Sequence, residues 1–391
     1  MRAAPDDGFS AVELLIACTL TAVALASVFQ LLDPANGMFR TAPERADVQQ
    51  RARVAMAALA DAIGRAGAGA AYGPAAGALV EHLAPVLPYR LGRRTPDAEG
   101  SARTDAITVL SVPLGAHQTT AAQPLPAQSG QVLIDLAPNC PQGDPSCGFE
   151  PGMTVLAIGG HGRFDLFSVT AVLGQTLTLQ HNTRDSAYVY PAGTALVEAS
   201  SRTFSLRADV ASDQAQLVRY DGDGGGDVPV VDHVAGLSFR YFATPLPPTM
   251  IKPPASTDGP WATYGPRPPL ITDQPTLYPS GENCAFQLDA AALPSARMPA
   301  LGGSALVEMP IAQLRDGPWC PDANDPNRFD ADLLRVRRVV AAVRVEASAA
   351  SLRHVSGEMF SRSGTAVQVG RAVADVELRF DVAPPSLEPG Q

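Results

Sequence analysis

Residues 9–32, FSAVELLIACTLTAVALASVFQLL, determine how the rest of the chain is interpreted. These 24 residues contain no Gly or Pro, and Glu13 is their single charged side chain. At about 1.5 Å per residue, such a helix spans roughly 36 Å, which exceeds a hydrocarbon core of about 30 Å. A soluble core helix rarely stays apolar on every side over this length. The stretch therefore predicts one helix that crosses a membrane.

A cleaved secretory signal is the first alternative. It would need a basic leader and a shorter apolar run followed by a small-residue cleavage site. The preceding residues, MRAAPDDG, carry one Arg and two Asp, and the run is too long. A carboxylate such as Glu13 is costly inside lipid and marks a functional position by default.

The sequence GFSAVE at positions 8–13, followed by the apolar run, resembles the prepilin signature of type IV pilins and type II secretion pseudopilins. The resemblance implies that a prepilin peptidase cuts between Gly8 and Phe9 on the cytoplasmic side and methylates the new amino terminus at Phe9. It also implies that Glu13 pairs with the freed amine of a neighbouring subunit during assembly. Because a lone buried charge is costly, this pair favours one axial register. A simple anchor is expected to gain nothing from Glu13.

Residues 43–67, PERADVQQRARVAMAALADAIGRAG, predict a second helical stretch that begins near Pro43 and stops at Gly67. Between the two stretches, Pro34 and Gly37 predict a bend or a melted turn. The predicted apolar face consists of Val48, Ala52, Ala55, Met56, Leu59 and Ile63. A pattern within the stretch resembles PilW-like minor pilins and pseudopilin J; it consists of Arg51, Arg53, Ala55, Leu59, Ile63, Ala66 and Gly67.

The remainder of the chain favours short strands over helices. Its 34 Gly and 36 Pro separate β-branched or alternating runs. The predicted strands are 107–112, 132–136, 154–158, 166–172, 176–179, 204–208, 216–220, 237–242, 336–347 and 373–382. They predict one large antiparallel sheet and a smaller β-unit at 152–193, which resembles a β-barrel-like insertion of some PilW-like proteins. Residues 216–220 and 230–242 resemble a hairpin that feeds the main sheet of minor pilins.

The predicted fold class is α+β, with a long amino-terminal helix followed by a large antiparallel β-rich, pilin-like head. We divide the chain into a leader (1–8), a membrane and assembly helix (9–32) and an amphipathic continuation (33–67). A head (68–244) follows, then a Pro-rich insertion (245–330) and the last strands of the head (331–391). Residues 245–279 alone hold 11 Pro, which cannot continue a sheet ladder.

Two interpretations of the insertion stay open. It is either a floppy loop or an ordered flap that binds a partner. The flap is favoured by a concentration of aromatic residues that a disordered loop normally lacks, namely Trp261, Tyr264, Tyr278, Phe286 and Trp319.

Five Cys are present, and Cys18 lies in the apolar helix. For an exported domain, the local pairing is Cys140–Cys147 with Cys284–Cys320, one of three connectivities that four Cys allow. Zinc is the rival interpretation, but the chain lacks a C-x-x-C motif and its His residues do not stand at ligand spacing.

An acidic turn at 221–227, DGDGGGD, is compared with a calcium loop. Asp221, Asp223, Asp227 and Asp232 stand at positions 1, 3, 7 and 12 of that pattern. Strands rather than helices flank the turn, so we favour a hairpin turn and expect no cofactor, with calcium as the weaker alternative.

The chain carries a net charge of −10 and no basic cluster, which argues against nucleic acid as a partner. None of the common motifs for nucleophilic, zinc or phosphate chemistry occurs, so we predict that the protein is not an enzyme. The resemblance implies a minor pilin, with a pseudopilin J-like tip subunit as the alternative. Its partners would be prepilin peptidase, other pilins or pseudopilins, and the inner membrane.

The head is expected on the exported side of the membrane, periplasmic or extracellular. A head of this size fits poorly in a repeating shaft, so we expect the subunit at the tip. A membrane-anchored binding protein outside any filament is the rival from another class.

Overall fold

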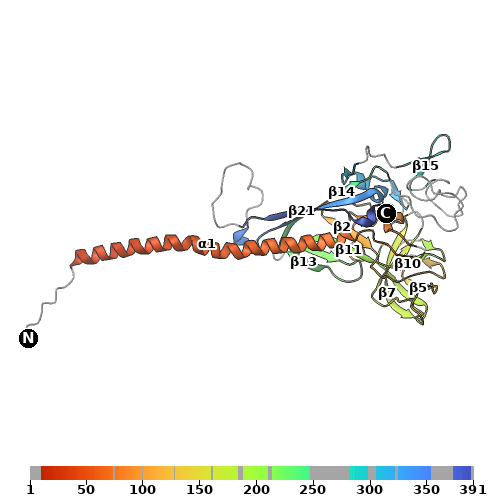
Figure 1. The fold of residues 1–391 in the computed structure, drawn as a ribbon, viewed down its shortest axis with the longest axis horizontal. Coiled ribbons are helices and arrows are strands. Elements are labelled where there is room, and N and C mark those ends of the chain that lie inside the picture. Colours follow the sequence, from red (N-terminus) through yellow and green to blue (C-terminus); the bar gives the residue numbers. More distant parts are fainter. Residues whose placement is uncertain are drawn as a thin grey trace, which may run out of the picture. The chain divides into compact units, whose positions relative to one another are not determined.

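The computed structural model describes residues 10–73, 75–98, 100–126, 128–159, 162–183, 188–209, 214–246, 282, 284, 286–297, 305–321, 325–353 and 373–388 (Figure 1). Over 30–40 it describes the backbone alone. The chain forms two compact units. One holds residues 1–51 and 345–376, and the other holds 52–344 and 377–391.

One helix, α1 (Ala11–Gly64), spans 54 residues. It stays helical through Pro34 and Gly37, so the alternative of a melted turn there is wrong. Pro34 removes one backbone hydrogen bond, and the helical turns on both sides continue across it. Pro43 likewise lies inside α1 and does not start a new helix.

The carboxyl-terminal part of α1 carries the predicted apolar face. Val48, Ala52, Ala55, Leu59 and Ile63 are fully buried, and Met56 is partly buried. The helix ends at Gly64, three residues before the predicted stop. Gly67 then takes a positive φ of 77°, and a Cβ there would lie 2.7 Å from a methyl of Leu387, so glycine is required at this turn.

A five-stranded sheet has the order β1-β2-β11-β12-β13, and all its pairs are antiparallel. Its strands are β1 (Val86–Leu87), β2 (Ala106–Ser111), β11 (Ser200–Asp209), β12 (Gln214–Tyr220) and β13 (Val228–Asp232). The hairpin expected after Gln216 is formed by β12 and β13.

A separate four-stranded sheet has the order β17-β14-β20-β21. It comprises β17 (Val307–Met309), β14 (Val234–Ala243), β20 (Val336–Val345) and β21 (Val376–Val382). The prediction of one large sheet is therefore wrong. His233, with a positive φ of 57°, lies within the stretch 230–242 that resembles one arm of a hairpin. β13 ends before it and β14 begins after it, so the chain passes there from one sheet to the other.

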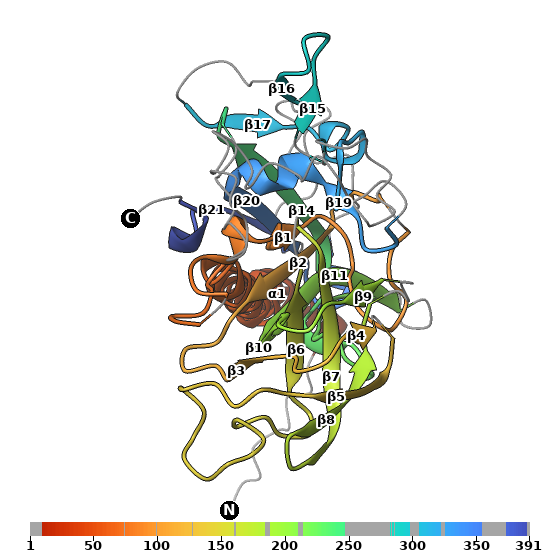
Figure 2. The same cartoon turned by 90° about the vertical axis from the view of Figure 1, so that its right-hand side faces the viewer.

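Six further strands form a small barrel in the order β3-β10-β6-β7-β8-β5 (Figure 2). They are β3 (Gln118–Thr120), β5 (Gly130–Leu133), β6 (Thr154–Ile158), β7 (Phe164–Leu173), β8 (Thr176–His181) and β10 (Ala195–Glu198). The two end strands meet through the antiparallel bridge Ala121–Ile134 and the hydrogen bond from Asp135 N to Thr120 O (2.9 Å), which closes the sheet.

The barrel confirms the consecutive hairpins expected within 152–193, but it extends from 118 to 198. Its interior is a cluster of buried side chains that includes Phe149, Phe167, Leu177 and Leu196. The whole barrel is inserted between β2 and β11, which pair directly with each other.

The Pro-rich insertion, which is the second insertion of the head, also lies between two neighbouring strands of one sheet. These strands are β14 and β20 of the four-stranded sheet. The described part of the insertion contains β15 (Phe286–Leu288), β16 (Pro294–Ala296), β17, β18 (Trp319–Cys320) and β19 (Phe329–Asp330). Residues 247–281, with Trp261, Tyr264 and Tyr278, lie outside the described residues, so the choice between loop and flap stays open for them.

The remaining elements are short. β4 (Leu125–Pro126) pairs with β9 (Val189–Tyr190). The 3-10 helices are η1 (Leu79–Glu81), η2 (Gln313–Arg315), η3 (Ala331–Arg335), η4 (Ala350–Leu352) and η5 (Pro385–Leu387).

Candidate functional site: an uncovered apolar helix and the polar clusters of the head

The amino-terminal part of α1 is long and apolar enough to cross a membrane. Residues Ala11–Phe29 have a mean hydropathy of 2.2, and none of this stretch is buried within the molecule. Leu20 and Phe29, for example, are 65% and 68% exposed. Water would penalise such a surface, because each large apolar side chain gains roughly 1.5–3 kcal/mol on burial. By length and composition, the stretch qualifies as a single membrane span or as a signal sequence.

Glu13 and Ser10 cap the start of α1. The Ser10 backbone N–H donates to Glu13 Oε2 (2.9 Å), and the Glu13 N–H donates to Ser10 Oγ (3.3 Å). This is a capping box, in which two otherwise unpaired N–H groups are satisfied reciprocally. The expectation that a simple anchor gains nothing from Glu13 is therefore wrong. The S-x-x-E spacing at 10–13 is the sequence signature of a capping box, so the sequence alone could have predicted it. Gly8 and Phe9 lie outside the described residues.

Both predicted disulfides are present, Cys140–Cys147 and Cys284–Cys320. Cys18 is the free cysteine, and it is exposed on the apolar part of α1. The first disulfide closes a loop at the barrel, between β5 and β6. The second lies within the Pro-rich insertion and links Cys284 to Cys320 of β18.

The four aspartates of the acidic turn are not brought together. Asp221 pairs with Arg219 (2.9 Å), Asp227 pairs with Arg90 (2.7 Å), and Asp232 accepts from Gln216 (2.7 Å). Asp223 accepts the Gly225 N–H (2.8 Å), as in an Asx turn. Among the residues that the structure describes, no group of three or more His, Cys, Asp or Glu is arranged to hold a metal.

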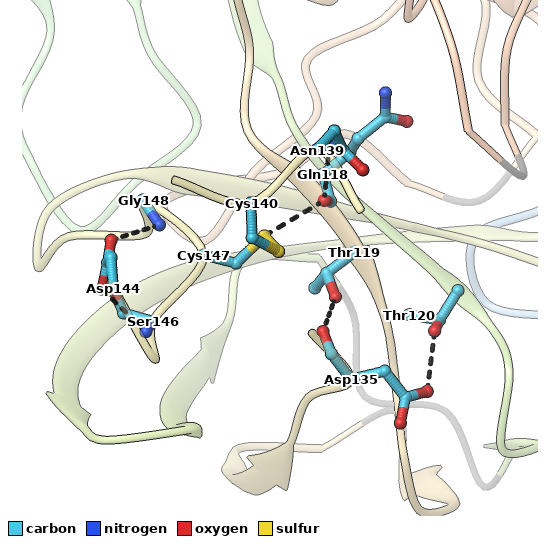
Figure 3. The surroundings of a disulfide bond; sticks show 10 residues. All are labelled: Gln118, Thr119, Thr120, Asp135, Asn139, Cys140, Asp144, Ser146, Cys147 and Gly148. Atoms are coloured by element: carbon cyan, nitrogen blue, oxygen red, sulfur yellow. Dashed lines mark hydrogen bonds between the residues drawn. A yellow bond between two sulfur atoms is a disulfide. The ribbon is translucent and has the colours of Figure 1, made fainter. Parts of the chain in front are cut away.

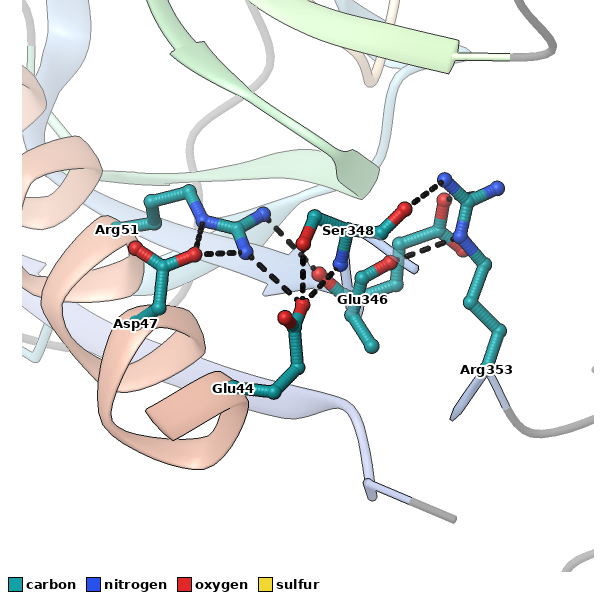
Figure 4. Close-up of polar contacts among 7 residues, drawn as sticks. Glu44, Asp47, Arg51, Glu346, Ser348 and Arg353 are labelled. Atoms are coloured by element: carbon teal, nitrogen blue, oxygen red, sulfur yellow. Dashed lines mark hydrogen bonds and ion pairs between the residues drawn. The ribbon is translucent and has the colours of Figure 1, made fainter. Parts of the chain in front are cut away.

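A polar cluster ties α1 to the segment after β20, within the smaller compact unit (Figure 4). Glu44 accepts from Ser348 Oγ (2.6 Å) and from the Ser348 N–H, and Arg51 reaches both Glu44 (3.4 Å) and the Glu346 carbonyl (3.3 Å). Partial burial alone would raise the pKa of Glu44. The bonds from Ser348 and the charge of Arg51 outweigh it, so the pKa of this carboxyl lies below its usual value.

A buried carboxylate, Asp165, holds the second insertion against the barrel. It contacts His181 Nε2 (2.9 Å) and accepts from Thr183 Oγ1 (2.9 Å) and the Tyr190 hydroxyl (2.7 Å). Asn327, from the insertion, donates to Oδ1, the oxygen that His181 and Thr183 also contact, whereas Tyr190 donates to Oδ2. Asp165 and the His181 side chain are each 2% exposed, so the Asp–His pair of this network is buried. It is a structural network that sequence reasoning missed, because its members are up to 162 residues apart.

A cavity of about 420 Å³ lies beside the end of α1 and the loop that enters the barrel. Its wall includes Arg65, Tyr72, Leu114, Gln118 and Arg202. Gln118 is 2% exposed, and its Oε1 has no hydrogen-bond partner. Arg65 and Arg202 both pair with Asp61, at 2.8 and 3.9 Å.

No protein-family model, curated protein or solved structure matched this chain. The functional conclusion therefore rests on the residues themselves.

Proposed function

We propose that the chain is a minor pilin or pseudopilin. In this proposal prepilin peptidase processes it after Gly8, α1 holds it in the inner membrane, and α1 then packs it into a pilus tip or priming complex. The observation that carries the proposal is the spacing of Gly8, Phe9 and Glu13 directly before an uncovered apolar helical stretch, Ala11–Phe29, in a helix that continues without a break to Gly64. A type II secretion pseudopilin J-like tip subunit remains the alternative within the class.

The antiparallel β-rich head is consistent with this proposal, because a helix that anchors and assembles the subunit leaves the head outside the membrane. The two disulfides support an exported head, since such bonds persist in oxidising compartments.

A membrane-anchored exported protein outside any filament is the second candidate, and the Ser10–Glu13 capping box favours it. The box gives Glu13 a local role in starting the helix, which needs no second subunit. The two candidates therefore differ in whether the charge of Glu13 or its hydrogen bond is what matters.

Three variants separate charge from capping. Glu13→Gln keeps a side chain that can complete a capping box but removes the charge. Glu13→Ala removes both, and Ser10→Ala removes one capping bond while the charge stays. Membrane insertion should be unchanged or easier in the Glu13 variants, because a charge leaves the apolar segment.

If Glu13 pairs with a neighbour's amine, both Glu13 variants fail to assemble and Ser10→Ala assembles. The measurement is co-purification of the mature protein with partner pilins, together with pilus counts or secretion in a deletion strain. Full complementation by Glu13→Gln would show that assembly does not need the charge of Glu13, and would leave capping as its role. A deletion strain with normal pili and normal secretion would leave the anchored protein as the better interpretation.

Processing supplies an independent test at Gly8. A small residue before the scissile bond lets the backbone enter a narrow protease site. Gly8→Val should therefore accumulate as the full-length precursor in the membrane, whereas Ala4→Val, in the same leader, should be trimmed as in the wild type. Normal trimming of Gly8→Val would refute the prepilin interpretation.

A further inference from the structure

Three exposed leucines lie in the segments at one end of the small barrel. The strand register places Leu133 opposite Thr176, Val197 opposite Gln118 and Glu198 opposite Val155. The connections at this end, together with the strand ends that adjoin them, are therefore 113–118, 134–153, 172–175 and 198–199, which we call the barrel rim. Exposed on it are Leu114 (106%), Leu136 (54%) and Leu173 (84%).

The leucines share the rim with acidic residues, with His117, and with no Lys or Arg. Asp135, Asp144, Glu150 and Glu198 all lie in the four segments, which contain no Lys or Arg. Elsewhere the chain carries 29 such residues, so their absence here is a local feature. Arg65 and Arg202 line the neighbouring cavity, where Asp61 pairs with both.

The rim is held in a fixed conformation (Figure 3). Cys140–Cys147 closes its longest loop, and Asp144 accepts the N–H groups of Ser146 (2.8 Å) and Gly148 (2.7 Å) within that loop. Asp135 accepts from Thr120 Oγ1 (2.8 Å). A surface ordered in advance loses less conformational entropy when it binds, which raises affinity without new contacts.

We propose that the barrel rim is a docking surface for a basic, apolar segment of another protein. The three exposed leucines at one ordered end of the barrel offer a partner apolar contacts, and apolar surface rimmed by polar residues is typical of interaction sites. The acidic residues around them attract cations and repel anionic lipid headgroups. Leu114 belongs both to the rim and to the wall of the cavity of about 420 Å³, which offers space for an anchoring side chain of the partner.

The test uses the full-length chain in nanodiscs of zwitterionic lipid and a short fluorescent peptide in which Arg and Leu alternate. Binding is followed by fluorescence anisotropy, with empty nanodiscs subtracted. The triple variant Leu114→Ser, Leu136→Ser, Leu173→Ser should weaken binding by roughly tenfold or more. Leu246→Ser and Leu293→Ser remove leucines of similar exposure (67% and 61%) outside the rim and should leave the affinity unchanged.

Charge is tested separately. Glu150 is exposed, so Glu150→Arg should weaken binding of the Arg–Leu peptide by several-fold. The circular dichroism spectrum of the variant should match that of the wild type. A peptide with Glu in place of Arg should bind at least about tenfold more weakly to the wild type than the Arg–Leu peptide does.

Four results would overturn the proposal. They are no measurable binding of the Arg–Leu peptide to the wild type, unchanged binding by the triple variant, equal binding of the Glu–Leu peptide, and binding of anionic phosphatidylglycerol vesicles that the triple variant abolishes. The last result would assign the rim to lipid. None of these measurements depends on cleavage at Gly8 or on Glu13, so the rim and the proposed assembly role fail independently.

Discussion

Asp330 is a carboxylate buried beside other acids at the base of the second insertion. It is 1% exposed and accepts the N–H groups of Gly317 (2.7 Å) and Asp332 (2.9 Å). Burial, together with the nearby charges of Asp332 and Asp316, raises its pKa to about 7. The folded state therefore holds a proton that the unfolded chain releases near pH 4. The stability from this group is present below pH 4 and is lost as the pH rises towards 7.

Asp330→Asn should remove that dependence, because an amide does not titrate. Gly317 and Asp332 donate to different carboxylate oxygens, so the single amide oxygen can accept only one of the two N–H groups, and the variant should lose about 1–3 kcal/mol at pH 4. Its stability relative to the wild type should then rise by up to about 4 kcal/mol between pH 4 and pH 8. Urea unfolding at the two pH values measures the effect. An equal loss of stability at both pH values would show that the carboxylate itself is required. Asp332 is paired with Arg335, so Asp332→Asn should lack this gain.

The burial pattern of α1 yields a prediction at the scale of an element. Leu59 is fully buried and Val54, on the same helix, is 46% exposed. Leu59→Ala should lower the free energy of unfolding by about 2–5 kcal/mol because it leaves a cavity. Val54→Ala should change it by less than about 0.5 kcal/mol. Chemical denaturation of the two variants measures both values, and equal losses would contradict the assignment of the buried face.

The two disulfides should differ in their effect on stability. In the chain-entropy model, closing a loop of 36 residues (Cys284–Cys320) contributes about 4 kcal/mol, and a loop of 7 residues (Cys140–Cys147) about 2 kcal/mol. Paired Cys→Ser variants should therefore lose stability in that order. Peptide mapping of protein isolated without reductant should find Cys18 as the one free thiol. Four further free thiols, or the reverse order of stability, would contradict the pairing.

Elements with a strong local pattern were predictable from the sequence. Nine of the ten predicted strands match observed strands over most of their length, and the tenth, 132–136, overlaps β5 (Gly130–Leu133) at two residues. The apolar face of α1 follows its spacing. The strands that were missed are short. Some are polar or carry Pro, such as β3 (Gln118–Thr120) and β4 (Leu125–Pro126), whereas β1 and β10 are apolar but span only two and four residues. The chain passes from one sheet to the other at His233, between β13 and β14. The positive φ of this residue does not show in the pattern of apolar residues, so the sequence did not predict the split. The Asp165 network depends on contacts over long sequence separations, which no local pattern records.

At the scale of the whole molecule, the head is a pair of β-sheets with two insertions. The barrel is inserted between the paired strands β2 and β11, and the Pro-rich insertion between the neighbours β14 and β20. An insertion between neighbouring strands leaves the sheet intact and can carry its own surface. This arrangement is compatible with the two separate roles that we propose, assembly for α1 and partner binding for the rim of the barrel.

The central claim is that the chain is a processed, filament-forming subunit, and the mass of its amino-terminal peptide tests it most directly. Protein purified from membranes of the native host is digested, and the peptide is identified by tandem mass spectrometry. The account predicts a peptide that begins at Phe9 and carries one added methyl group on its α-amine, with residues 1–8 absent. A peptide that begins at Met1 or Arg2, or a cut after the apolar run beyond Leu32, would contradict it.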